Sequence, residues 1–75
     1  MKYFFDLVGQ QQSEYDYQGR VFSASVGALK LAELMALNLE FEGQGKWSGW
    51  RINVRDAYGR QFFSIPIQEA DLIAA

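Results

Sequence analysis

The stretch SVGALKLAELMALNLEFE, residues 25–42, predicts the long helix of this chain and decides its fold class. Small and apolar residues recur along one face at 3.6 residues per turn. These residues are Ala28, Leu29, Ala32, Met35, Ala36 and Leu39. Ser25 is a candidate N-cap because its hydroxyl can accept a hydrogen bond from a free amide of the first turn. Gly43 suits a left-handed residue just after the last turn.

The remaining surface of this helix is unusually apolar. Lys30, Glu33 and Glu40 form only a narrow polar stripe, and Leu31 and Leu34 lie to one side of it. A helix that is apolar nearly all round is normally covered on both sides. In a chain of 75 residues, we expect the second covering layer to come from another copy.

Composition indicates one folded domain over residues 1–75. Hydrophobic residues make up 49% and aromatic residues 16% of the chain, which argues against disorder. The sequence has no cysteine and no histidine, so neither disulfides nor thiol or imidazole chemistry are expected. The net charge of -2 argues against a general polyanion binder. No apolar run approaches the ~20 residues of a membrane span, and Asp6 interrupts any signal-peptide core, so we expect a cytoplasmic protein.

Two strands are expected before the helix. Lys2–Val8 is apolar on both faces, which is typical of a central strand. Residues 14–22 form a weaker strand, interrupted by a turn at residues 16–19, that should pair back on the first strand.

Two more strands are expected after the helix. Residues 50–55 alternate, with the apolar side chains inward, and residues 56–59 (DAYG) are typical of a hairpin turn. Residues 60–67 follow as a fourth strand, whose register pairs either Val54 with Phe62 or Ile52 with Phe63. Pro66 lacks an amide hydrogen, which favours a sheet edge. Residues 68–75 end the chain as a short helical turn or a frayed tail.

The expected fold is therefore α+β, in ββαββ order, with one helix packed across one face of an antiparallel sheet. One helix covers only two or three strands of one face. The open face should then carry Phe4, Val8 and some of the aromatic residues at 62, 63 and the two tryptophans. Such surface favours a homodimer. The predicted contact residues are Phe4, Leu31, Leu34, Phe62 and Phe63.

Several stretches resemble a family of short, uncharacterised bacterial proteins, mainly alphaproteobacterial, that is described as a domain of unknown function. They are YFFDL at residues 3–7, Asp-x-x-Gly at 16–19, the alanine-rich helix, and VRDAYGRQFFSIPI at 54–67. Members share aromatic-Phe-Asp/His-Leu near the start and Val-x-Asp-x-x-Gly-Arg near the end. The chain departs from that pattern in the tryptophan-rich loop at 47–50 and the glutamine run at 10–12. The resemblance implies the fold order and a bacterial source, and it implies no activity.

The stretches 16–20 and 56–60 share the pattern Asp-x-x-Gly-Arg, in which aligned amides and an arginine could hold an anion. The same residues are what turns themselves require, so we interpret both as hairpin turns.

Residues 46–60 contain four basic residues and one acidic residue, a local excess of basic charge on an acidic chain. Arginines and aromatic rings on a sheet can stack single-stranded bases. The candidate residues are Trp47, Arg51, Arg55 and Arg60. We favour a solvated strand face instead, because dedicated nucleic-acid binders are more basic.

No pattern indicates an enzyme, a metal site or a cofactor, and we assign no catalytic, cofactor-binding or metal-binding residue. Asp6, the carboxylate in the most apolar strand, is interpreted as a buried or edge group bonded to a backbone amide, to Tyr15 or Tyr17, or to an arginine. We expect a non-catalytic module that associates with itself or with a protein partner. The alternative is a weak binder of single-stranded nucleic acid or of a small anionic ligand.

Overall fold

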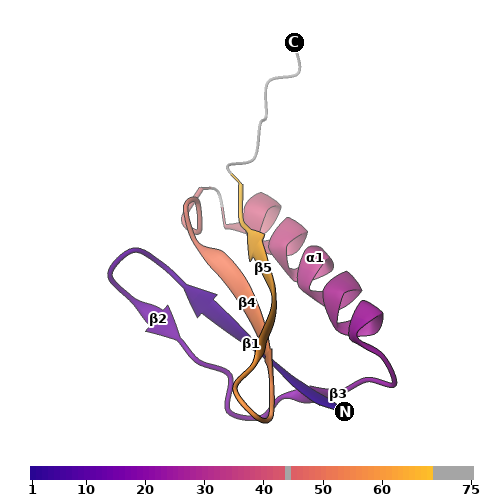
Figure 1. The fold of residues 1–75 in the computed structure, drawn as a ribbon. Coiled ribbons are helices and arrows are strands. Elements are labelled where there is room, and N and C mark those ends of the chain that lie inside the picture. The colour runs from indigo at the N-terminus through magenta and orange to yellow at the C-terminus, as the bar shows by residue number, and fades with distance from the viewer. Residues whose placement is uncertain (44, 69–75) are drawn as a thin grey trace.

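The computed structural model describes residues 1–43 and 45–68, which form one helix against one face of an antiparallel sheet (Figure 1). This confirms the α+β class. The elements are β1 (Lys2–Val8), β2 (Ser13–Glu14), β3 (Arg20–Val21), α1 (Ser25–Glu42), β4 (Arg51–Asp56) and β5 (Gln61–Pro66). The second expected strand is present as two short pieces, β2 and β3. Of the tail predicted over residues 68–75, positions 69–75 lie outside the described residues.

The strand order is β2-β1-β4-β5, and β3 also pairs with β1. β1 is therefore central, as its two apolar faces predicted, and β5 lies at an edge, as Pro66 predicted. Because β2 and β3 both pair antiparallel with β1, residues 16–19 interrupt one strand and do not form a hairpin turn. The prediction of a hairpin there was wrong, whereas residues 57–60 do connect the paired strands β4 and β5.

The β4–β5 register matches neither expected alternative. Val54 pairs with Phe63 and Ile52 with Ile65, and a bulge follows between Val54 and Arg55. The bulge inserts Phe62 as an extra residue, and its ring lies edge-on to Tyr3 with centroids 5.5 Å apart. Phe63 consequently shares the face of Val54 and packs against the core.

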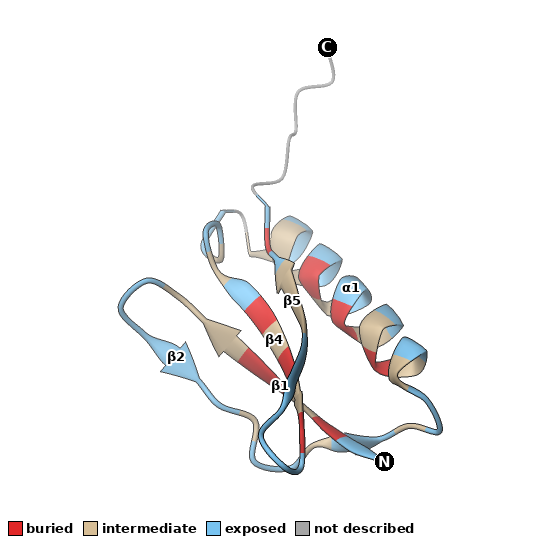
Figure 2. Ribbon diagram, viewed as in Figure 1, coloured by how far each residue is buried: buried red, intermediate tan, exposed pale blue. Residues whose placement is uncertain are grey.

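The core lies between α1, β1, β4 and the end of β5 (Figure 2). Ala28, Ala32 and Ala36 are the buried residues of the helix, and they lie over Ile52 and Val54 of β4, both 0% exposed. Small side chains allow the helix to approach the sheet closely. The larger apolar side chains of α1 are consequently distributed over its flanks and its outward face.

The helix has the predicted bounds, but the roles predicted for the residues at its two ends were wrong. Ala24 is the N-cap, without a side-chain cap, and Ser25 is already the first helical residue. Gly43 has a right-handed conformation with φ -78°, so no left-handed turn requires a glycine at this position. A glycine is required by contact, because an added Cβ would lie 2.6 Å from Cδ1 of Trp47.

The face of the sheet opposite the helix is mainly polar, contrary to expectation. The strand pairing places Asp6, Asn53 and Ser64 in one row across this face, and Arg55 beside Phe4 in the next. The Ser64 hydroxyl donates a hydrogen bond of 2.7 Å to Oδ1 of Asn53. The rings at positions 47, 50 and 63 instead pack against the core. The open sheet face is therefore not the exposed apolar surface of this protein.

Candidate functional site

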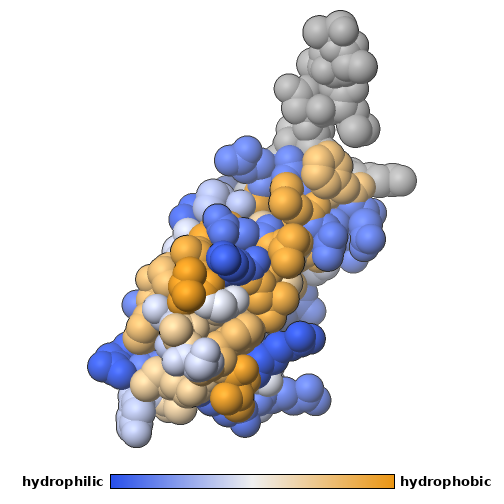
Figure 3. Space-filling model, turned by 90° about the vertical axis from the view of Figure 1, so that its right-hand side faces the viewer, coloured by the Kyte–Doolittle hydropathy of each residue, from blue (hydrophilic) through white to orange (hydrophobic). Residues whose placement is uncertain are grey.

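The outward face of α1 carries the largest set of exposed apolar side chains on one element. Val26, Leu34, Leu37 and Phe41 are 54%, 59%, 48% and 60% exposed. Their spacing places them on one side of the helix, opposite the buried alanines. We call these residues the outer stripe. Figure 3 views the molecule from the α1 side, where apolar residues reach the surface among hydrophilic ones.

Charges along this helix are distributed unevenly. Lys30 lies on the same side of α1 as the outer stripe, in the N-terminal half, and is the helix's single basic residue. Glu40 and Glu42 lie in the last turns, where no basic residue is present, and Glu33 lies near the middle. The C-terminal half is therefore acidic, and it also contains the negative end of the helix dipole.

A groove runs beside the outer stripe, between α1 and β5. Its volume is about 300 Å³, and Leu37 and Ala36 on the helix and Ile65 and Pro66 on the strand form its apolar part. The carboxylates at positions 33 and 40 and the side chain of position 68 line the remainder. Leu37 thus belongs both to the outer stripe and to this groove, so the two form one continuous surface.

The five residues predicted for a partner surface do not lie together. Leu34 belongs to the outer stripe, whereas Leu31 and Phe63 are half-buried against the core. Phe62 lies near the β4–β5 hairpin and is 38% exposed. Phe4 lies on the opposite face of the sheet, with Cζ of Arg55 4.6 Å from its ring centroid.

Sequence reasoning did not assign Val26, Leu37 or Phe41 to the predicted contact surface. A second helical periodicity, at positions 26, 30, 34, 37 and 41, was present in the sequence. It could have been found by indexing the residues opposite the alanine face.

Arg55 bonds to acidic groups of the same chain. Its Nε donates to Oδ2 of Asp6 at 2.7 Å, and its Nη2 donates to the backbone oxygen of Asp16 at 3.1 Å. Asp6 is 3% exposed and also accepts the amide of Asp16 at 2.9 Å. Of the alternatives that the sequence left open for Asp6, the structure shows the buried group, bonded to an amide and an arginine.

In each Asp-x-x-Gly-Arg stretch, backbone amides donate hydrogen bonds to the aspartate side chain of the same stretch. Oδ1 of Asp16 accepts the amides of Gln18 and Gly19, and its Oδ2 accepts the amide of Phe5. Burial alone would raise the pKa of Asp16, but these hydrogen bonds and the charge of Arg55 outweigh it and lower that pKa. The amides that could have held an anion already bind a carboxylate.

Asp56 is fully buried at the β4–β5 turn. Its Oδ1 accepts the amides of Tyr58 and Arg60, and its Oδ2 accepts Nε of Arg60 at 2.7 Å. Burial would raise the pKa of Asp56, but these hydrogen bonds to the carboxylate lower it overall. Gly59, with φ 83°, completes the turn.

The residues of the alternative ligand surface are dispersed. Trp47 lies before β4 and Arg60 after it, at opposite ends of a strand of six residues. Arg51 and Arg55 share the open face of β4, and Arg51 donates from Nε to the Ser64 hydroxyl at 2.7 Å. Arg55 and Arg60 form ion pairs with buried aspartates. These side chains therefore do not form one basic, aromatic surface.

Within residues 1–43 and 45–68, histidine, cysteine and carboxylate side chains do not gather into a group that could hold a metal ion. No helix in that part of the chain combines the length and the apolar character of a membrane span.

A family model described as "Domain of unknown function (DUF6894)" matches residues 2–68 of this chain. No curated protein and no solved structure matches the sequence.

Proposed function

This chain belongs to that family of unknown function, and we propose that it acts as a non-catalytic association module, a homodimer formed through the outward face of α1. The observation that supports the proposal is the outer stripe. Four large apolar side chains share one side of a helix whose opposite side is already used for the core. Association with a second copy would remove this surface from water.

Charge complementarity favours an antiparallel pair of helices. In that arrangement, Lys30 of one copy lies toward the half of the other copy that carries Glu40 and Glu42. A parallel two-fold arrangement would instead place each charged residue beside its own counterpart. Antiparallel helix dipoles are also favourable to each other.

The groove beside α1 extends the contact. An 18-residue helix is only about 27 Å long, so a contact between two helices alone would bury less than the ~1,200 Å² of a stable complex. In an antiparallel pair, stripe residues of one copy can enter the groove lined by Leu37, Ile65 and Pro66 of the other. We therefore expect a dimer of moderate affinity, in the micromolar range.

Analytical ultracentrifugation over a range of concentrations tests this function. The wild-type chain should sediment as a dimer at about 200 µM, whereas Leu34→Glu and Leu37→Glu should remain monomeric with unchanged circular dichroism. Tyr58→Glu is the matched control, because Tyr58 is 81% exposed at the β4–β5 turn and should leave the dimer intact. A wild-type monomer throughout the range would overturn the proposal.

The nucleic-acid alternative has less support. Two of its three arginines have buried carboxylate partners, and the third is bonded to Ser64. Counterion release needs cations that are free to meet phosphates. A bacterial source and a cytoplasmic location stay predictions from the sequence.

A further inference from the structure

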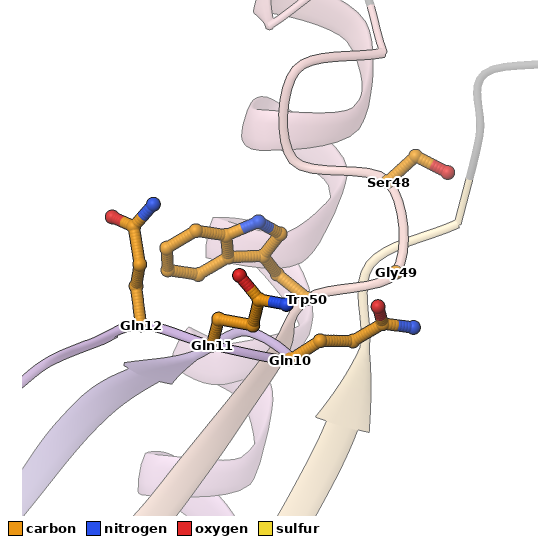
Figure 4. A pocket seen from close by; sticks show the side chains of 6 residues that line it. All are labelled: Gln10, Gln11, Gln12, Ser48, Gly49 and Trp50. Carbon is orange, nitrogen blue, oxygen red and sulfur yellow. The ribbon is translucent and has the colours of Figure 1, made fainter.

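A second surface feature lies at the end of the sheet, away from the outer stripe. A groove of about 400 Å³ opens between the β1–β2 loop and the loop that precedes β4 (Figure 4). Its lining consists of Gln10, Gln11, Gln12, Ser48, Gly49 and Trp50. The glutamine run and the tryptophan-rich loop, which are distant in sequence, therefore meet at one site.

Backbone contacts hold both walls of this groove in place. The amide of Gly9 donates to the backbone oxygen of Gln12 at 2.7 Å and closes the glutamine loop. The amide of Trp50 donates to the oxygen of Trp47 at 3.0 Å, and the amide of Ile67 donates to the oxygen of Trp50 at 2.8 Å. Gly9 allows the indole to approach, because an added Cβ would lie 2.8 Å from Cε2 of Trp50. The aromatic wall is thus preorganised.

The lining combines an indole with uncharged hydrogen-bonding groups. In Figure 4, the side chains of Gln11 and Gln12 lie beside the indole of Trp50, whereas the side chain of Gln10 extends away from the indole toward Gly49 and the Ser48 hydroxyl points away from it. Within the part of the chain that the structure describes, no hydrogen bond engages the side chains of the three glutamines, Ser48 or Trp50. Each carboxamide offers two donor hydrogens and an acceptor oxygen. The hydrogen-bonding groups of these side chains are therefore available to a ligand.

A second hollow adjoins the first. It has a volume of about 530 Å³, shares Gln12 and Trp50 with the groove, and is completed by Glu14, Lys46 and Trp47. The two indole rings meet edge-on with centroids 4.8 Å apart. Both volumes fall within the ~300–1,000 Å³ of small-ligand sites. The two hollows together suit an extended ligand.

We propose that this groove, named here the Gln–Trp groove, binds a neutral saccharide chain. A sugar ring presents C–H groups that can cover an indole face, and hydroxyl groups that both donate and accept hydrogen bonds. Carboxamides match hydroxyls in both directions, and an aromatic ring with a few convergent polar groups is a common ligand-site composition. The proposal does not depend on dimer formation through α1.

The same chemistry disfavours other ligands. A phosphate-bearing ligand needs cationic partners, but the lining of the 400 Å³ groove contains no charged residue, and the adjoining hollow has one lysine and one glutamate. A proline-rich peptide also binds aromatic grooves, but its proline residues offer only carbonyl acceptors. It could accept from the carboxamide N–H groups at positions 10–12 but could not donate to their oxygens, which would stay bonded to water because all three residues are exposed.

The test is a titration of the ¹⁵N-labelled full chain, followed by amide and indole N–H resonances. The probes are cellopentaose, chitopentaose and maltopentaose, each up to about 10 mM, with deca-proline as the competing class. At least one oligosaccharide should shift the indole N–H signals of Trp47 and Trp50 and the amides at positions 10–12 in a saturable manner.

Variants then locate the site. Gln11→Ala combined with Gln12→Ala should weaken binding about tenfold, because it removes two hydrogen-bonding groups from an exposed loop. Gln61→Ala, an exposed glutamine on β5, is the matched control and should bind as the wild type does. The proposal is overturned if no oligosaccharide shifts these signals, if the double variant binds unchanged, or if only deca-proline binds.

Discussion

Arg55 and Asp6, 49 positions apart in the chain, form an ion pair across the neighbouring strands β4 and β1, with Nε and Oδ2 2.7 Å apart. The Asp6 side chain is only 5% exposed, whereas Arg55 is 30% exposed. We predict that Arg55→Ala lowers the free energy of unfolding by about 2–3 kcal/mol, because it leaves a buried carboxylate without its cation. Urea denaturation would measure this as a lower midpoint at an unchanged slope.

Arg51→Ala serves as the control for that experiment. Arg51 is exposed and bonds Ser64 on the same open face, so its removal should cost less than about 1 kcal/mol. Equal midpoints for the two variants would show that burial of Asp6 does not strengthen its pairing with Arg55.

Acid should destabilise the fold through Asp16 and Asp56. Both have a pKa below the usual value in the folded state, so the unfolded chain takes up protons first as the pH falls. Their contribution is fully present above the ordinary aspartate pKa of about 4 and is lost as the pH falls through the lower folded values. Urea midpoints measured between about pH 6 and pH 2.5 should therefore decline mainly below pH 4.

The variant Asp16→Asn isolates one of these groups. It should be less stable at neutral pH and should lose less stability than the wild type on acidification, because one linked carboxylate is gone. Glu42→Gln, at an exposed position, is the matched control and should keep the wild-type pH profile. An Asp16→Asn profile parallel to that of the wild type would contradict the assignment.

Substitution of Gly43 or Gly59 by alanine should destabilise the fold, for a different reason at each position. Gly43 has an ordinary φ, but its Cβ would lie 2.6 Å from both the backbone oxygen of Leu39 and Trp47 Cδ1, so Gly43→Ala should cost about 1–3 kcal/mol through displacement of the indole and of the end of the helix. Gly59 has open space around it and φ 83°, so Gly59→Ala should cost about 1–2 kcal/mol through backbone strain alone. Near-ultraviolet circular dichroism distinguishes them, because only the first should alter the tryptophan signal.

Thermal stability should depend on protein concentration if α1 mediates dimer formation. Mass action raises the melting temperature of an associating fold as the concentration rises. Calorimetry of the wild type between about 10 and 500 µM should show this increase, and Leu37→Glu should abolish it. A concentration-independent melting temperature in the wild type would argue against a dimer of moderate affinity.

Binding of single-stranded nucleic acid should be negligible. The arginines on β4 and in the following turn are bonded within the chain, so few are free to replace counterions. Fluorescence anisotropy of a labelled oligonucleotide should stay flat at both low and physiological salt. A saturable rise that weakens with salt would favour the alternative function.

The sequence predicted the elements of this fold better than their alignment. The helix over residues 25–42 and the strand over 2–8 were predicted with the bounds that the structure has, because each contains an uninterrupted pattern. The β4–β5 register could not be predicted, because it depends on a bulge at Phe62. That bulge is accompanied by a contact with Tyr3, which is remote in the chain.

The candidate surface was only partly predictable for a related reason. Both sides of α1 are apolar, so periodicity alone could not decide which side faces the sheet. The structure places the alanines inward and Leu34 and Leu37 outward, since close packing over β4 requires small residues. The Gln–Trp groove was not predictable, because only the pairing of β1 with β4 brings its two loops together.

The separation of core residues from surface residues on α1 has an evolutionary consequence. Its inward alanines and its outward large residues are separate sets. Substitution at the outward positions can therefore alter which molecules are recognised without disturbing the interior. A lineage could diversify its associations along this helix while every descendant kept the same architecture.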